Sequence, residues 1–200
     1  MHMDNHAGSI ALHHHDSDAT DVFGFWLYIL TDCILFSCLF ATFLVLNHAS
    51  PYAPSLKSHI DLRYVLIETF VLLASNFTFC LASLSLYHER IRRVQFWLLL
   101  TFLLGACFVG MELSEFYHLA TSDFSWSVSA QASAFFTLVG THGLHVSFGL
   151  LWIFILFTQF FSIRNLKTMK RRMTILGLFW NFLDIVWIFV FSIVYLMGAM

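Results

Sequence analysis

The sequence predicts an all-α integral membrane protein, a polytopic bundle of five transmembrane helices. Hydrophobic residues make up 59% of the 200 residues and charged residues only 11%, whereas about a quarter of the residues in a soluble domain are charged. Only two prolines and nine glycines interrupt the chain, which favours long unbroken helices. We expect a membrane protein with no nucleic-acid partner.

Five apolar segments reach the roughly 20 residues that a helix needs to cross a bilayer. They cover residues 23–47, 62–87, 94–119, 130–162 and 173–199. The short connections predict that consecutive helices pack as antiparallel neighbours, in one transmembrane domain over residues 23–200. Residues 1–22 contain neither Lys nor Arg and no long apolar core. They predict a disordered, His-rich cytoplasmic tail rather than a signal peptide.

Basic residues predict how these helices are oriented. Eight of the ten Lys and Arg residues follow the second and fourth segments. These are Arg90, Arg92, Arg93, Arg164, Lys167, Lys170, Arg171 and Arg172. Because cytoplasmic loops carry an excess of Lys and Arg, we expect a cytoplasmic N-terminus and a periplasmic C-terminus. Such clusters also suit anionic lipid head groups, although topology alone explains most of the charge.

The cysteines give no sign of a metal site or a disulfide. All four lie inside apolar segments: Cys33, Cys38, Cys80 and Cys107. None forms a C-x-x-C pair, so they are predicted to be small buried side chains.

Ionisable side chains lie inside the predicted spans, where each costs about 2.5–3.5 kcal/mol on insertion scales and needs a partner or a function. Four near mid-depth are predicted to form one layer: Asp32, His142, His145 and Asp184. Four others are predicted to form a second layer nearer the outer surface: Glu68, Glu112, Glu115 and His118. Three of these are spaced by three residues, which places them near one helix face.

A metal site is one interpretation of these groups. Glu115 and His118 form a Glu-x-x-His unit of the kind used in di-iron bundles, but such bundles need two copies of the unit and two further glutamates. This chain has one copy. His142 and His145 could offer two ligands, which do not complete a site. A self-sufficient membrane di-metal enzyme is therefore the less favoured alternative.

A second interpretation is that the polar groups pair across helices in a desolvated bundle. Asp32 hydrogen-bonded to a histidine would then fix the first span against the fourth. Gly140, Gly143 and Gly149, around the histidines, would let another helix approach closely. A channel or transporter is a weaker third interpretation, because it would need Gly or Pro breaks in corresponding halves and the only prolines lie in a loop.

Five stretches of sequence, in chain order, resemble one family. They are "FGFWLYILTDCILFSCLFATF", "LIETFVLLASNFTF", "GACFVGMELSEFYHL", "FFTLVGTHGLHVSFGLLW" and "FWNFLDIVWIFVFSIVYLMGAM". They resemble subunit III of the haem–copper oxidases, most closely the five-span form of the bacterial cytochrome o ubiquinol oxidase. The resemblance covers all five spans.

The resemblance implies a non-catalytic subunit of a proton-pumping ubiquinol oxidase in the respiratory chain of a bacterial inner membrane. The chain would support the assembly, lipid binding and stability of catalytic subunit I, with subunits I, II and IV and phospholipids as partners. It implies no cofactor, metal or catalytic residue in this chain, with haems and copper in subunit I and ubiquinol as the substrate of the complex. The equivalent subunit of a cytochrome c oxidase or a nitric oxide reductase is the alternative.

The resemblance also implies roles for individual residues. Asp32 matches a buried, carbodiimide-reactive glutamate of longer relatives, and with the two histidines it would line or brace a lipid cleft. Glu68 and Glu115 match polar positions of the same bundle. Asn181 stands where the family usually has His, and it is expected to hydrogen-bond Asp184 without titrating.

Overall fold

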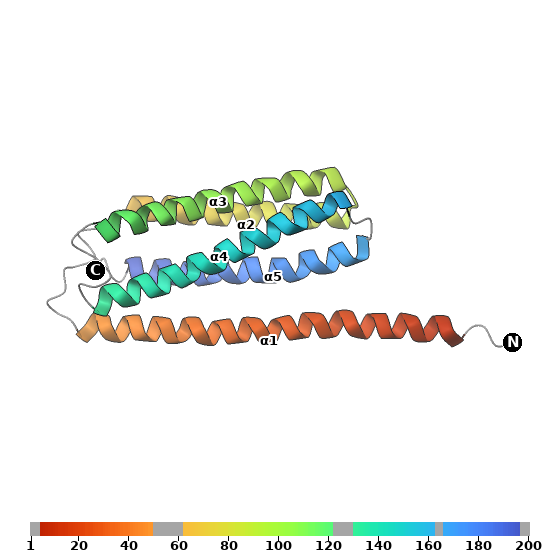
Figure 1. The fold of residues 1–200 in the computed structure, drawn as a ribbon, viewed down its shortest axis with the longest axis horizontal. Coiled ribbons are helices and arrows are strands. Elements are labelled where there is room, and N and C mark those ends of the chain that lie inside the picture. The colour runs from red at the N-terminus through yellow and green to blue at the C-terminus, as the bar shows by residue number, and fades with distance from the viewer. Residues whose placement is uncertain (1–4, 50–61, 122–129, 163–165, 197–200) are drawn as a thin grey trace. The chain divides into compact units, whose positions relative to one another are not determined.

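The computed structural model describes residues 5–49, 62–121, 130–162 and 166–196 (Figure 1). The helices are α1 (Asn5–Ala49), α2 (Leu62–Tyr87), α3 (Ile91–Thr121), α4 (Ala130–Ser162) and α5 (Leu166–Val190), with α5 continuing as the π-helical segment η2 (Phe191–Leu196). Within these described ranges, five helices are long and apolar enough to cross a membrane. This confirms the predicted five-helix membrane fold.

Two helices begin earlier than the hydropathy predicts. α3 begins at Ile91 and α5 at Leu166, so most of the basic residues assigned to loops lie in the first two turns of these helices. These are Arg92, Arg93, Lys167, Lys170, Arg171 and Arg172. Lys and Arg are good helix formers and their long side chains reach water from a helix end, so a hydropathy boundary need not end a helix. Arg164 lies outside the described residues.

The first helix also begins earlier than expected. α1 starts at Asn5 and runs through most of the segment predicted to be a disordered tail. Residues 5–22 contain no proline and a single glycine, Gly8. Once a helix exists, each added residue adds one hydrogen bond, so a span of this kind can propagate toward the N-terminus.

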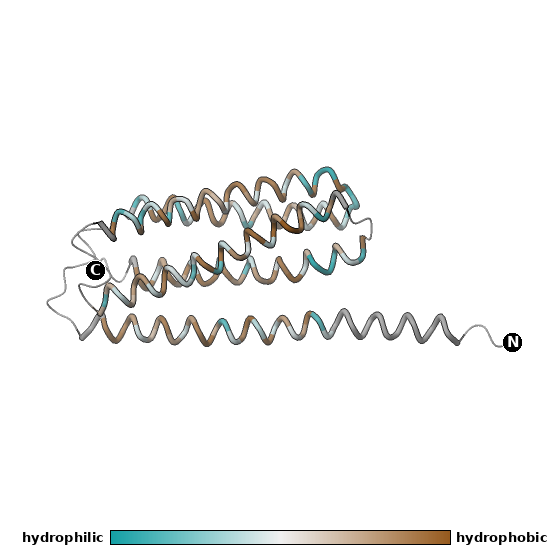
Figure 2. The backbone as a smooth tube through the Cα atoms, in the orientation of Figure 1, coloured by the Kyte–Doolittle hydropathy of each residue, from teal (hydrophilic) through white to brown (hydrophobic). Residues whose placement is uncertain are grey.

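The chain divides into two units, residues 1–35 and 36–200. In the second unit, α2 packs against α3 and α5, and α4 packs against the same two helices. Consecutive helices from α2 to α5 are therefore neighbours, as predicted, and α5 closes the bundle by returning to α2. Hydrophilic residues gather at the bundle end where α2 meets α3 and α4 meets α5 (Figure 2).

The prediction that the cysteines are buried is wrong. Cys33, Cys38, Cys80 and Cys107 are all exposed on the surface of their helices. Large apolar side chains are exposed in the same way, among them Phe70 and Leu144. Lipid tails are as apolar as leucine, so an apolar position in a membrane helix does not predict burial.

The turn between α2 and α3 has the geometry of a Schellman motif. Arg90 donates its backbone N–H to the Ser85 carbonyl at 3.1 Å, and Glu89 donates to the Leu86 carbonyl at 3.1 Å. Glu89 adopts the left-handed conformation, with φ at 57°, a position usually occupied by glycine. Its side chain forms a 3.8 Å ion pair with Lys170.

Replacing Glu89 with glycine is expected to stabilise the protein. The left-handed conformation costs a non-glycine residue about 1–2 kcal/mol, whereas an exposed ion pair contributes only about 0–1 kcal/mol. Thermal unfolding of the purified protein would measure the change. Glu89→Gln is the matched control, since it removes the ion pair and keeps the strained backbone. A Glu89→Gly variant less stable than Glu89→Gln would contradict the prediction.

Candidate functional site

Side chains from four helices meet in an aromatic layer, which we define as Thr69, Phe108, His142 and Trp187. The fully buried His142 ring of α4 stacks on Trp187 of α5, with centroids 5.1 Å apart and an interplanar angle of 30°. Phe108 of α3 packs edge-on against both rings, at 6.1 Å and 4.8 Å. The Trp187 indole N–H donates to the Thr69 hydroxyl of α2 at 3.0 Å. The layer thus joins α2, α3, α4 and α5.

The two histidines of "GTHGLH" contact aromatic rings of neighbouring helices. Neither ring nitrogen of His142 has a hydrogen-bond partner among the described residues, and the ring is held by aromatic packing. The Nδ1 atom of His145 lies 2.7 Å from the Thr141 carbonyl, one turn back on α4. Phe36 contacts both imidazoles, with centroids at 6.5 Å and 5.4 Å. Across the described residues, no group of three or more His, Cys, Asp or Glu side chains could hold a metal ion.

Asp184 of α5 is buried one turn before Trp187, but its neighbour differs from the predicted one. Asn181 is exposed, so the expected hydrogen bond from Asn181 to Asp184 was wrong. Asn76 of α2 approaches the Asp184 carboxyl instead, although neither oxygen accepts a bond of good geometry within the described residues. Sequence reasoning missed Asn76, and an amide inside the apolar word "LASNFTF" is the signal that could have found it.

The second polar layer consists of carboxyl groups from two neighbouring helices. Glu68 of α2 and Glu112 of α3 are buried, and Glu115 of α3 is half-buried. The three are close enough to interact electrostatically. His118, predicted in the same buried layer, is exposed. Each step of three residues turns a helix back by about 60°, so after two steps from Glu112 the side chain has left the buried face.

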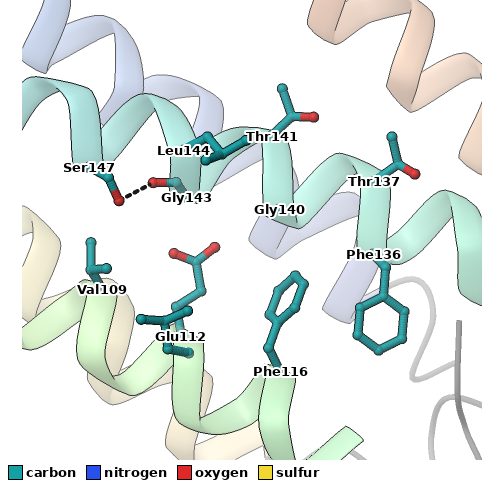
Figure 3. A pocket seen from close by; sticks show the side chains of 11 residues that line it. Val109, Glu112, Phe116, Phe136, Thr137, Gly140, Thr141, Gly143, Leu144 and Ser147 are labelled. Atoms are coloured by element: carbon teal, nitrogen blue, oxygen red, sulfur yellow. Dashed lines mark hydrogen bonds between the residues drawn. The ribbon is translucent and has the colours of Figure 1, made fainter. Parts of the chain in front are cut away.

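Glu112 also lies at the edge of a groove of about 440 Å³ between α3 and α4. Figure 3 shows its carboxyl directed across the groove toward Gly143 of α4, between Val109 and Phe116. Both carboxyl oxygens lie 2.8 Å from the position that a Cβ atom on Gly143 would occupy. The glycine is what allows a carboxyl group to pack there against a neighbouring helix.

Gly143→Ala is expected to destabilise the bundle by about 1 kcal/mol, because the new methyl group displaces the Glu112 carboxyl. The displaced atoms are the end of a flexible side chain, so the loss should be small. Adding Glu112→Ala should remove the clash. Unfolding of the two single variants and the double variant would give the coupling between the sites. Equal effects of Gly143→Ala in both backgrounds would contradict this account.

The expected close approach at the glycines is also found at Gly149. The buried Trp180 ring of α5 fits between α3 and α4, with ring atoms 3.2 Å and 2.8 Å from the Cβ positions of Gly105 and Gly149. At Gly140 the nearest atom belongs to Phe116, at 3.6 Å, which is an ordinary contact. Trp180 was absent from the predicted site residues, although it lies within the word "FWNFLDIVW".

Asp32 lies in the other unit, on α1. There the Tyr28 side chain, one turn back, forms a hydrogen bond with it. The predicted contact between Asp32 and the histidines joins the two units and stays a prediction.

Comparison with known proteins identifies the bundle. The sequence matches the family described as "Cytochrome c oxidase subunit III" over residues 5–199. The chain belongs to this family. It is 53% identical over 188 residues to the cytochrome bo(3) ubiquinol oxidase subunit 3 of Pseudomonas aeruginosa. The matched residues make up 94% of this chain and 90% of that protein. The resemblance drawn from the five stretches of sequence is thus confirmed.

More distant subunit III relatives extend over nearly the same length. The chain is 41% identical to the cytochrome bo(3) ubiquinol oxidase subunit 3 of Buchnera aphidicola subsp. Baizongia pistaciae, across 89% of this chain and 92% of that protein. It is 40% identical to a probable quinol oxidase subunit 3 of Staphylococcus aureus, across 88% of each.

Proposed function

We propose that this chain is the accessory subunit III of a ubiquinol oxidase, in a complex that passes electrons from ubiquinol to oxygen in a bacterial inner membrane. The observation that carries the proposal is 53% identity, over 94% of the chain, to a protein named as subunit 3 of a ubiquinol oxidase. The five membrane-spanning helices agree with a multi-pass inner-membrane protein.

In this proposal the subunit contributes packing, while subunit I holds the haems and copper. Among the described residues no group of three or more His, Cys, Asp or Glu side chains could hold a metal ion. The His142 ring is packed against Phe108 and Trp187, and His145 Nδ1 lies 2.7 Å from a carbonyl of its own helix. The aromatic layer and its Trp187–Thr69 hydrogen bond join four of the helices. A rigid bundle of this kind supports a neighbouring catalytic subunit, with subunits II and IV as further partners.

The proposed orientation has a cytoplasmic N-terminus and a periplasmic C-terminus. The support is that the hydrophilic end of the bundle, in Figure 2, is the end where α2 meets α3 and α4 meets α5. Arg90, Arg93, Lys170 and Arg172 lie at those helix ends. Basic residues flanking spans favour the cytoplasmic side.

Purification through a tag on this chain, in mild detergent, tests the proposal. We expect haem absorbance, co-purifying larger membrane subunits and oxygen uptake driven by ubiquinol. Oxygen uptake driven by reduced cytochrome c, with none from ubiquinol, would move the chain to the cytochrome c oxidase branch. A colourless single protein of about the mass of this chain, 23.1 kDa, would overturn the assignment if other membrane complexes survive the same conditions.

A further inference from the structure

A second groove, of about 410 Å³, lies where α2 ends and α3 begins. One part of its wall is apolar, formed by Leu81, Leu84 and Trp97. The other part carries His88, Arg90 and Arg93. Arg92 lies between these two arginines in the sequence but does not line the groove. We call this feature the α2–α3 groove.

The Schellman turn fixes the cationic side of the α2–α3 groove. Because Glu89 takes the left-handed conformation, the chain reverses within a few residues, and both arginines stand beside the end of α2. The Glu89 carboxylate, which could have neutralised them, is paired with Lys170 of α5 at 3.8 Å. Within the described part of the chain, neither Arg90 nor Arg93 forms an ion pair.

The position of the groove in the membrane decides which ligand fits. Its cations lie at the boundary of two spans, Arg63–Tyr87 and Ile91–Leu119, where head groups are found. Leu84 and Leu81 lie about one and two turns further into the span than His88, and Leu84 is 54% exposed. A ligand must therefore offer an anionic group to the guanidinium groups and an apolar chain to the leucines. The planar guanidinium group of arginine can donate two parallel hydrogen bonds to phosphate oxygens.

We propose that the α2–α3 groove is a binding site for an anionic phospholipid, with its phosphate on Arg90 and Arg93 and its acyl chain along Leu81 and Leu84. The lipid enters from the bilayer, to which Leu84 of the apolar wall is exposed. The orientation of the spans depends only on how many basic residues lie near the span ends, not on which residues they are. The proposed site needs these two particular arginines, and that difference can be tested. The inference does not depend on the subunit assignment, since it rests on the spans and the groove alone.

The test uses the tagged protein with its co-purifying partners, reconstituted in phosphatidylcholine vesicles with a trace of photoactivatable phosphatidylglycerol. Labelled peptides from the α2–α3 region are quantified by mass spectrometry. A charge-assisted hydrogen bond to a phosphate changes binding by about tenfold or more. Arg90→Gln and Arg93→Gln should therefore each lower labelling by about tenfold, and the double variant by about 100-fold. Arg92→Gln is the matched control for each single variant, since it removes one charge outside the groove, and diffuse attraction alone should lower its labelling by no more than about fivefold.

Competition and the control separate the outcomes. We expect unlabelled phosphatidylglycerol to displace the label, and inorganic phosphate at the same concentration to leave it in place. An equal loss in Arg92→Gln would overturn the proposal in favour of diffuse attraction. Displacement by phosphate would reduce the site to a simple anion site. An unlabelled wild-type complex would also overturn the proposal, because a protein segment would then cover the groove. Oxidase activity is not the readout, so these results stand apart from the test of function.

Discussion

Trp180→Ala is expected to destabilise the bundle by about 3–5 kcal/mol, the usual cost of emptying a buried aromatic site. Trp180 is 1% exposed, and its ring packs closely against α3 at Gly105 and against α4 at Gly149. Apolar attraction does not hold helices together inside a bilayer, so loss of this packing removes a main contact of α5 with α3 and α4.

Gly149→Ala tests the same contact from the opposite side. The added methyl group would stand 2.8 Å from a rigid indole ring, and overpacking of this kind costs about 1–3 kcal/mol. Gly110→Ala is the matched control on α3, since nothing lies within 4 Å of its Cβ position. Removing a mid-helix glycine there should be neutral or stabilising, by up to about 1 kcal/mol.

Thermal unfolding of the tagged complex, together with the fraction of subunit III that stays bound to its partners, would measure these effects. Trp180→Ala and Gly149→Ala should both lower the midpoint, while Gly110→Ala should keep or raise it. If Gly110→Ala were as harmful as Gly149→Ala, the general intolerance of α3 and α4 to larger residues, rather than the Trp180 contact, would be the cause.

Trp187→Ala is the second substitution with a large expected effect, also about 3–5 kcal/mol. It removes the ring that stacks on His142 and contacts Phe108, together with the hydrogen bond to Thr69. Trp187→Phe should keep most of the packing and lose the hydrogen bond, at about 1–2 kcal/mol. Thr69→Val is the control that removes the acceptor and keeps the ring, with an expected loss of about 1 kcal/mol.

Substitutions of His142, in the same aromatic layer, distinguish a packing role from a role in the reaction. His142→Phe keeps an aromatic ring between Phe108 and Trp187, so we expect an assembled complex with its haem spectrum and its ubiquinol oxidation retained. His142→Ala should lower the unfolding midpoint. A His142→Phe complex that assembles with full haem content but no longer oxidises ubiquinol would contradict a packing role and give the imidazole a part in the reaction.

Much of the fold follows from the sequence because a bilayer allows few structures. Every backbone polar group must be satisfied within its own helix, so length and hydropathy predict the spans, and α2 and α4 have the predicted bounds. The early starts of α3 and α5, at basic residues, and the helical structure of the N-terminal segment were not predicted. The reason is that hydropathy marks the lipid-embedded part of a helix rather than its ends.

The sequence by itself determined which residues are polar inside the membrane and which family the chain resembles. Only the tertiary structure decided how those residues are used: His142 stacks on Trp187, Asp184 lies near Asn76 rather than Asn181, and Trp180 fills a glycine-lined gap. The physical reason is that spacing fixes a residue's angle on its own helix. Its partner depends on which helix packs opposite and on whether a glycine there leaves room.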